Sequence, residues 1–295
     1  MFLSVIIPTY NYRCYTLVAD LQRQLEAVGE PYEIIVAEDG SKDQVTIIAN
    51  HKIIDLPNCR HLIRKENVGR AAIRNFLVSE AKGEWLLFMD SDARVISSDY
   101  ISTYINAIKE AAGHQIIIGG LRHTDRLPSP EVSLRYYYEK EADQHRSAAE
   151  RQQHPFQHLT TFNMCVLRSV MMNTPFDEDC REYGYEDALL GVTLKNKGVS
   201  VMHIDNPLEH TGLEPNKKYL AKVETALHTL HSLGDKMVPH SHVGQAAEKA
   251  RKWFLSLPII MLLHILRPLL RHNLLSEKPN LKVLAFYKLG YFLSL

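Results

Sequence analysis

The most constraining feature of the chain is a short apolar run that ends in two acidic residues. Residues 85–89 read Trp-Leu-Leu-Phe-Met, and Asp90-Ser91-Asp92 follows directly. Such a run predicts a strand buried on both faces, as in a parallel sheet. Side chains two residues apart point the same way, and open α/β sheets bind ligands at the carboxyl ends of their strands. The two carboxylates therefore suit Mg²⁺ or Mn²⁺, although solvated loop residues would show the same spacing.

Two other predicted strands end in polar loops of the same kind. The strand at residues 3–7 leads into Pro8-Thr9-Tyr10-Asn11, and the strand at 32–37 leads into Glu38-Asp39-Gly40-Ser41. A helix is predicted between these strands, so we expect a parallel pair with a right-handed crossover. In a doubly wound sheet the three loops converge on one edge, where a nucleotide would lie between the acidic turns.

Composition narrows the class of protein. The 295 residues are enough for one large or two smaller domains, and 34 basic residues balance 34 acidic ones, which argues against a general nucleic-acid binder. The four cysteines show no metal-type spacing, so we expect free thiols. The first residues lack the features of a signal peptide, and we expect a cytoplasmic protein.

A second pair of acids opens a helix late in the sequence. Glu186 and Asp187 follow Tyr183-Gly184-Tyr185 and lead an apolar helical pattern. Acids in a first turn are favoured by the helix dipole alone, which leaves a structural reading open beside a catalytic one. His210 follows a further strand and is either a metal ligand or an ordinary loop histidine.

From Trp253 onward the chain has a different composition. Residues 254–266 are almost wholly apolar, yet the run is shorter than the ~20 residues of a membrane-spanning helix. Basic residues on both sides favour an element that lies at a membrane interface, whereas a helical cap packed on the main domain, or a dimer contact, is the alternative. We divide the chain into residues 1–215, the main domain, and 216–295, a C-terminal helical region.

In their order and spacing, these motifs resemble the family 2 glycosyltransferases of GT-A fold. The similarity covers residues 3–212 and rests on five motifs together, because each alone is weak. They are Val5-Ile6-Ile7-Pro8-Thr9-Tyr10-Asn11, Glu38-Asp39-Gly40-Ser41, Asn67-Val68-Gly69 with Ala72, Arg74 and Asn75, Asp90-Ser91-Asp92, and Glu186-Asp187. Position 38 is Glu where Asp is commoner, and Tyr-Gly-Tyr before Glu186 replaces the Trp-Gly of several subfamilies, which leaves the acceptor open.

The resemblance implies a role for each matching position. Asp92 would ligate the metal with His210 as an extra ligand, and Asp187 would be the general base, supported by Glu186. The positions that would bind the nucleotide-sugar are Pro8, Thr9, Tyr10, Asp39 (at the base), Asn67, Gly69, Arg70, Asp90 (near the ribose and sugar) and Ser91.

The resemblance also implies a fold and an activity. The fold would be α/β, with a Rossmann-like, mostly parallel central sheet flanked by helices and a C-terminal helical appendage. The activity would be inverting transfer of a hexosyl or N-acetylhexosaminyl group, with Mn²⁺ or Mg²⁺. The donor would be a nucleotide-sugar, commonly a UDP-sugar, and the acceptor a glycan or lipid-linked molecule of polysaccharide biosynthesis at the cytoplasmic face of a membrane. The alternatives are a non-catalytic nucleotide-sugar-binding protein and a nucleotidyltransferase of similar topology.

Overall fold

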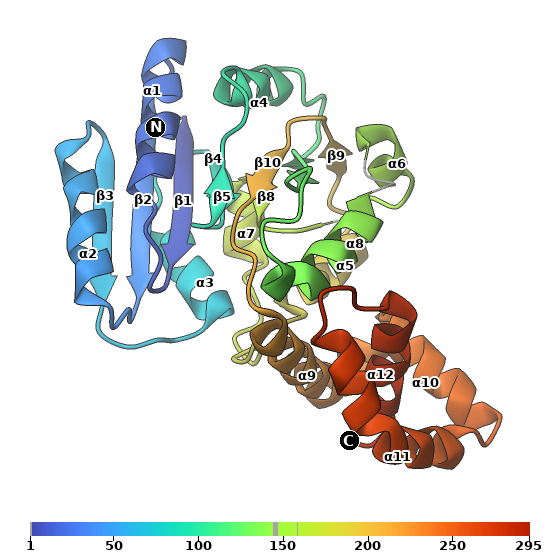
Figure 1. The fold of residues 1–295 in the computed structure, drawn as a ribbon. Coiled ribbons are helices and arrows are strands. Elements are labelled where there is room, and N and C mark those ends of the chain that lie inside the picture. Colours follow the sequence, from blue (N-terminus) through green and yellow to red (C-terminus); the bar gives the residue numbers. More distant parts are fainter. Residues whose placement is uncertain (1, 144–146, 158) are drawn as a thin grey trace. The chain divides into compact units, whose positions relative to one another are not determined.

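The computed structural model describes residues 2–143, 147–157 and 159–295, and its contacts group them into two compact units (Figure 1). The first unit consists of the described residues within 1–122, 145–181 and 186–212. The second consists of those within 123–144, 182–185 and 213–295. The second unit therefore takes two short segments from the middle of the chain in addition to its C-terminal part.

A seven-stranded sheet forms the centre of the first unit, in the order β3-β2-β1-β4-β8-β6-β9. Strands β1 to β4 are mutually parallel, β8 runs antiparallel to both of its neighbours, and β9 is parallel to β6. The expected mostly parallel sheet is confirmed. The strands are β1 (Leu3–Thr9), β2 (Tyr32–Asp39), β3 (Cys59–Arg64), β4 (Trp85–Met89), β6 (Ile116–Ile118), β8 (Asn163–Leu167) and β9 (Val201–His203).

Successive side chains of each strand point to opposite faces of the sheet, and each face packs into its own apolar core. From β1, Leu3, Val5 and Ile7 pack with α1 (Tyr15–Val28) and α4 (Tyr100–Lys109), whereas Ile6 packs with the helices of the opposite face. Those helices are α3 (Arg70–Glu80), α7 (Arg168–Asn173) and α8 (Glu186–Asn196). The remaining helices of this unit are α2 (Gln44–His51) and α6 (Ala148–Gln153).

A small three-stranded sheet lies in the same unit, in the order β5-β10-β7. Its strands are β5 (Ala93–Arg94), β10 (Leu208–His210) and β7 (Leu121–Arg122). The fully buried Asn163 at the start of β8 accepts hydrogen bonds from the hydroxyls of Tyr100 and Tyr104 at 2.6 and 2.7 Å. Its amide donates to the carbonyls of Gly120 and Asn206, so this one side chain joins α4 to the turns beside β7 and β10.

The second unit is helical. It contains α5 (Ser133–Asp143), α9 (Asn216–Leu233), α10 (His242–Lys252), α11 (Ser256–Leu274) and α12 (Leu281–Leu293). Its core includes Leu220 from α9, Leu263 from α11 and the fully buried Tyr287 from α12. A C-terminal helical region is thus present, and part of α11 and α12 packs within it.

The sequence located the elements well, with small errors at their ends. The apolar run 85–89 is β4, and the helix predicted between the first two strands is α1. The strand predicted at residues 3–7 continues to Thr9, and the strand predicted at 32–37 continues to Asp39. All four cysteines are free thiols, as expected.

Among the described residues, no single helix has the length and apolar composition of a membrane span. Helices α10 and α11 pass that test only as a pair, and they are bent by 117° at the break between them.

Candidate functional site

The loops after β1 and β2 meet, as the sequence predicts. The Asn11 side-chain oxygen accepts hydrogen bonds from the backbone N–H groups of Lys42 and Asp43, and the Asn11 backbone N–H donates to the Ser41 hydroxyl. Of the predicted nucleotide-binding residues in this region, Pro8 and the buried Thr9 belong to β1, and the Tyr10 side chain is half exposed.

Asp39, at the end of β2, is tied to the start of α3. Its carboxylate accepts the backbone N–H groups of Val68 and Gly69 at 2.9 and 3.2 Å, and Asn67 donates to its carbonyl at 3.0 Å. Burial raises the pKa of Asp39, and these N–H donors offset that effect only in part. Gly69 has a φ of +87°, and a Cβ there would lie 2.8 Å from the carbonyl oxygen of Arg181, so only glycine fits.

Glu38 faces the interior behind Asp39. It is fully buried and accepts hydrogen bonds from Asn50 at 2.8 Å, from Ser41, and from the ring of His61 at 3.2 Å. Burial alone would raise the pKa of Glu38, but these hydrogen bonds outweigh it and lower the pKa. The Glu-for-Asp departure at position 38 thus belongs to a buried network that supports the turn.

Arg74 forms ion pairs with acidic residues of the site. Its guanidinium is almost fully buried and donates to Asp90 at 3.0 Å and to Glu186 at 3.2 Å. Asp187 lies 3.8 Å from the same guanidinium, and the more exposed Arg70 lies 3.5 Å from Glu186. Arg74 therefore brings the end of β4 and the start of α8 to one point.

The two acids at the start of α8 have different surroundings. Asp187 accepts hydrogen bonds from the backbone N–H and hydroxyl of Thr161, and burial raises its pKa despite the attraction of Arg74. Burial acts on Glu186 as well, but the positive charges of Arg74 and Arg70 outweigh it and lower the Glu186 pKa. Asp187 is therefore the more basic member of the pair.

Asp92 faces His210 across a narrow gap. The Asp92 Oδ2 atom lies 3.2 Å from Nε2 of the buried His210, and Thr211 donates its N–H and hydroxyl to the Asp92 carbonyl. A Cβ on Gly212 would lie 2.0 Å from Asp92 Oδ2, so glycine is required for this arrangement. Ser91, between the two aspartates, is half-buried in the same turn.

All of the predicted site residues lie in the first unit. Arg74, though part of a motif, was not predicted as a site residue. The sequence contains a pattern that could have identified it. Ala71, Arg74 and Val78 share the buried stripe of α3, and an arginine in such a stripe needs acidic partners.

Two solved structures with a similar fold contain UDP or UDP-glucose. Staphylococcus aureus TarS (residues 1–349, in complex with UDP) matches with a TM-score of 0.54 at 19% identity, over 79% of this chain and 66% of that one. Mycobacterium tuberculosis glucosyl-3-phosphoglycerate synthase, with UDP-glucose and Mn²⁺, matches with a TM-score of 0.51 at 16% identity, over 78% and 79%. At these identities the likeness shows the fold, which is of GT-A type.

The sequence match gives the family. The profile described as "Glycosyl transferase family 2" matches residues 4–172, more than half of the chain. The chain therefore belongs to glycosyl transferase family 2. The uncharacterized glycosyltransferase YfnE of Bacillus subtilis is 32% identical over 145 residues, which are 48% of this chain and 34% of that protein. Streptococcus pneumoniae GlyG is 29% identical over 123 residues, 42% and 40% of the two chains. The chain thus spans about a third to two fifths of these relatives.

We expect Arg74→Met to lower the free energy of unfolding at pH 7 by roughly 3–5 kcal/mol, because it leaves buried carboxylates without their shared cation. Urea unfolding measures this loss. Arg23→Met, at an exposed arginine of α1, is the control and should change stability by less than about 0.5 kcal/mol.

The free energy of unfolding that Arg74→Met removes should be smaller at acidic pH than at pH 7. In the wild type, the lowered pKa of Glu186 stabilises the fold at neutral pH, and this contribution disappears as the pH falls through that pKa. Without Arg74, both acids would take up protons at higher pH, which removes the repulsion between them. A difference between variant and wild type that is no smaller at about pH 4.5 than at pH 7 would contradict this account.

Proposed function

We propose that the chain transfers a sugar from a UDP-sugar donor to a hydroxyl group by a single, inverting displacement. The observation that carries the proposal is the Arg74 cluster, which joins Asp90 at a strand end to a separate acidic pair at a helix start. Sugar transfer needs both positions, one beside the departing nucleotide and one beside the incoming hydroxyl. The family membership and the UDP-bound neighbours support the same chemistry.

On the donor side, we assign the nucleotide to the edge where the first two loops meet. The Asp39 carboxylate, held by two backbone N–H groups, faces the base, and Arg70 is exposed enough to reach a diphosphate. Asp90 is oriented by Arg74 toward the ribose and sugar. The other residues assigned to the donor are Pro8, Thr9, Tyr10, Asn67, Gly69 and Ser91.

Asp92 and His210 fit a shared divalent metal. Two ligands at right angles, each about 2.1 Å from one ion, lie about 3.0 Å apart, close to the 3.2 Å between Asp92 Oδ2 and His210 Nε2. A carboxylate oxygen with an imidazole nitrogen suits Mn²⁺, and a bound ion would neutralise charge on the leaving diphosphate. Gly212 leaves room for the Asp92 oxygen that would face the ion.

We expect Asp92→Asn to abolish the effect of Mn²⁺ on UDP affinity. Calorimetric titration of the wild type should give a UDP affinity at least about tenfold higher with Mn²⁺ than with a chelator, and the variant should give equal values. Asp99→Asn, at an exposed acid of the same segment, is the control and should behave as the wild type. Equal UDP affinity of the wild type with and without Mn²⁺ would refute the metal assignment.

On the acceptor side, we assign the general base to Asp187. The acceptor oxygen forms a bond to the anomeric carbon while the bond from that carbon to the diphosphate breaks, and the nucleoside diphosphate leaves with the electron pair. The hydroxyl proton passes to the Asp187 carboxylate, whose raised pKa makes it the better base of the pair. Glu186, whose negative charge is stabilised by two arginines, supports the arrangement.

Asp187→Asn should therefore lower turnover by roughly 10²-fold or more while UDP-sugar affinity changes little. With water as the acceptor, turnover is followed as UDP release from a panel of UDP-hexoses and UDP-N-acetylhexosamines. Glu186→Gln is the matched comparison and should retain more activity than Asp187→Asn. The reverse order would move the base to Glu186, and full activity in both variants would refute a catalytic role for the pair.

We further propose that the second unit binds an anionic membrane surface, which suits a lipid-linked acceptor. Residues 253–255 and one face of α11 expose large apolar side chains, and Phe254 is 90% exposed in the left-handed backbone region with a φ of +57°. Lys249, Arg251 and Lys252 lie beside them at the end of α10. An exposed apolar face flanked by cations is the pattern of interfacial helices. The apolar residues are Trp253, Phe254, Leu255, Leu257, Met261, Leu262, Ile265 and Leu269.

The pair Phe254→Ser and Ile265→Ser should reduce binding to phosphatidylglycerol vesicles at least about tenfold, because both side chains would enter the apolar phase. Vesicle flotation at low salt measures it. Val45→Ser with Ile48→Ser, at exposed apolar positions of α2, is the matched control and should leave binding unchanged. If the wild type ignores the vesicles and forms a dimer that the first pair dissociates, the face is a protein interface instead.

A further inference from the structure

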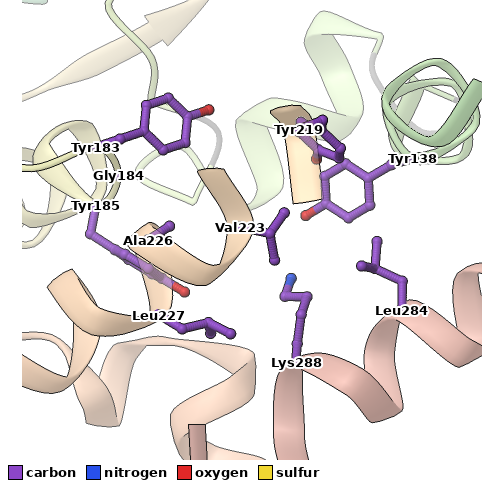
Figure 2. A pocket seen from close by; sticks show the side chains of 10 residues that line it. All are labelled: Tyr138, Tyr183, Gly184, Tyr185, Tyr219, Val223, Ala226, Leu227, Leu284 and Lys288. Carbon is purple, nitrogen blue, oxygen red and sulfur yellow. The ribbon is translucent and has the colours of Figure 1, made fainter. Parts of the chain in front are cut away.

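The second unit contains a cavity lined by tyrosines. Its volume is about 190 Å³, and Tyr138 from α5, Tyr219 from α9 and Lys288 from α12 contribute side chains to its wall (Figure 2). Tyr183 and Tyr185 come from the short segment 182–185, which belongs to the same unit. The proposed donor and metal residues all lie in the first unit, so this cavity is a separate feature of the chain.

The segment that carries two of these tyrosines is held in a strained conformation. Gly184 has a φ of +104°, and Tyr185 has a φ of +68°, which an aromatic residue rarely adopts. A Cβ on Gly184 would lie 2.7 Å from Cβ of Ala226, and Thr229 donates to the Tyr183 carbonyl at 3.1 Å. Such strain costs roughly 1–3 kcal/mol and is typically found at ligand sites. The two rings are therefore positioned before any ligand arrives.

The wall of the cavity combines aromatic faces, hydroxyls and a positive charge. The rings of Tyr138 and Tyr219 lie 6.2 Å apart, and Lys288 Nζ lies 5.3 Å from the Tyr138 ring. Burial raises the pKa of Tyr185 to about 12, so its hydroxyl stays protonated and can donate. Within the described part of the chain, no carboxylate forms an ion pair with Lys288, whereas the nearby Lys222 pairs with Glu214.

These features match one kind of ligand. A pyranose ring presents a face of C–H groups that packs on tyrosine rings, and hydroxyls around its edge that bond to phenols. The volume is below the ~300–1,000 Å³ of sites for drug-sized ligands, so it suits a single ring. The ammonium group of Lys288 adds a preference for a negatively charged substituent.

We propose that this cavity binds one anionic sugar of the acceptor, a pyranose that carries a carboxylate or a phosphate. The inference rests on the proposed function, since the cavity segment leads directly into the acidic pair assigned to the acceptor: Tyr185 precedes Glu186 in the chain. Along the chain, residues 182–185 therefore join the cavity to the acidic pair.

The test uses the full chain and three probes, glucuronate, glucose 6-phosphate and glucose, with affinities from saturation-transfer NMR titrations. One or both anionic sugars should bind at least about tenfold more tightly than glucose, and Lys288→Gln should remove that preference while glucose affinity stays the same. Lys282→Gln, at an exposed lysine of the same helix, is the matched control and should keep it. Tyr138→Leu should weaken all three probes by about three- to tenfold, and its exposed position makes the change tolerable for folding.

The outcomes separate this inference from the proposed function. Titration of UDP with Mn²⁺ on the same sample tests the donor site. If UDP binds but neither anionic sugar is preferred over glucose, or if Lys282→Gln has the same effect as Lys288→Gln, the cavity inference is wrong and the proposed function stands. If the sugars bind as expected but UDP does not, the proposed function fails and the cavity remains a sugar site.

Discussion

The first unit depends on the burial of one arginine. A guanidinium taken out of water is costly unless carboxylates compensate it, and for Arg74 they come from β4 and α8. The helix that carries Arg74 is itself fixed at its start, where the Val68 and Gly69 N–H groups bind Asp39. Residues 39, 74, 90 and 186 are distant in the sequence, so the contacts that make α3 stable also assemble the candidate site.

The strand ends of this site were predictable because they follow from local pattern. Buried strands read as apolar runs, and the polar residues that stop them collect at one edge of a parallel sheet. The role of Arg74 was harder to predict. Arginines on helices usually face solvent, and the meaning of one in a buried stripe depends on which acids the fold brings to it. Those acids lie 16 and 112 residues away from it along the chain.

For a related reason, the sequence does not predict which segments make up the second unit. The sequence predicts a C-terminal helical region, but it does not indicate that residues 182–185 pack with it. That placement depends on Gly184, whose missing side chain allows contact with Ala226, and on Tyr185, whose strained φ no propensity scale favours. Sequence patterns report average preferences, and a strained segment departs from them.

The two acids at the start of α8 differ in proton affinity because burial and the nearby arginines act on them to different extents. Burial raises the pKa of both carboxylates, and nearby positive charges lower it. The guanidinium lies closer to Glu186, at 3.2 Å, than to Asp187, at 3.8 Å, and Arg70 adds a second positive charge on the Glu186 side. Glu186 therefore carries the negative charge that balances Arg74, while Asp187, in contact with Thr161, keeps the higher proton affinity. Burial thus keeps the proton affinity of Asp187 high against the attraction of Arg74, while the ion pair with Glu186 compensates the buried guanidinium.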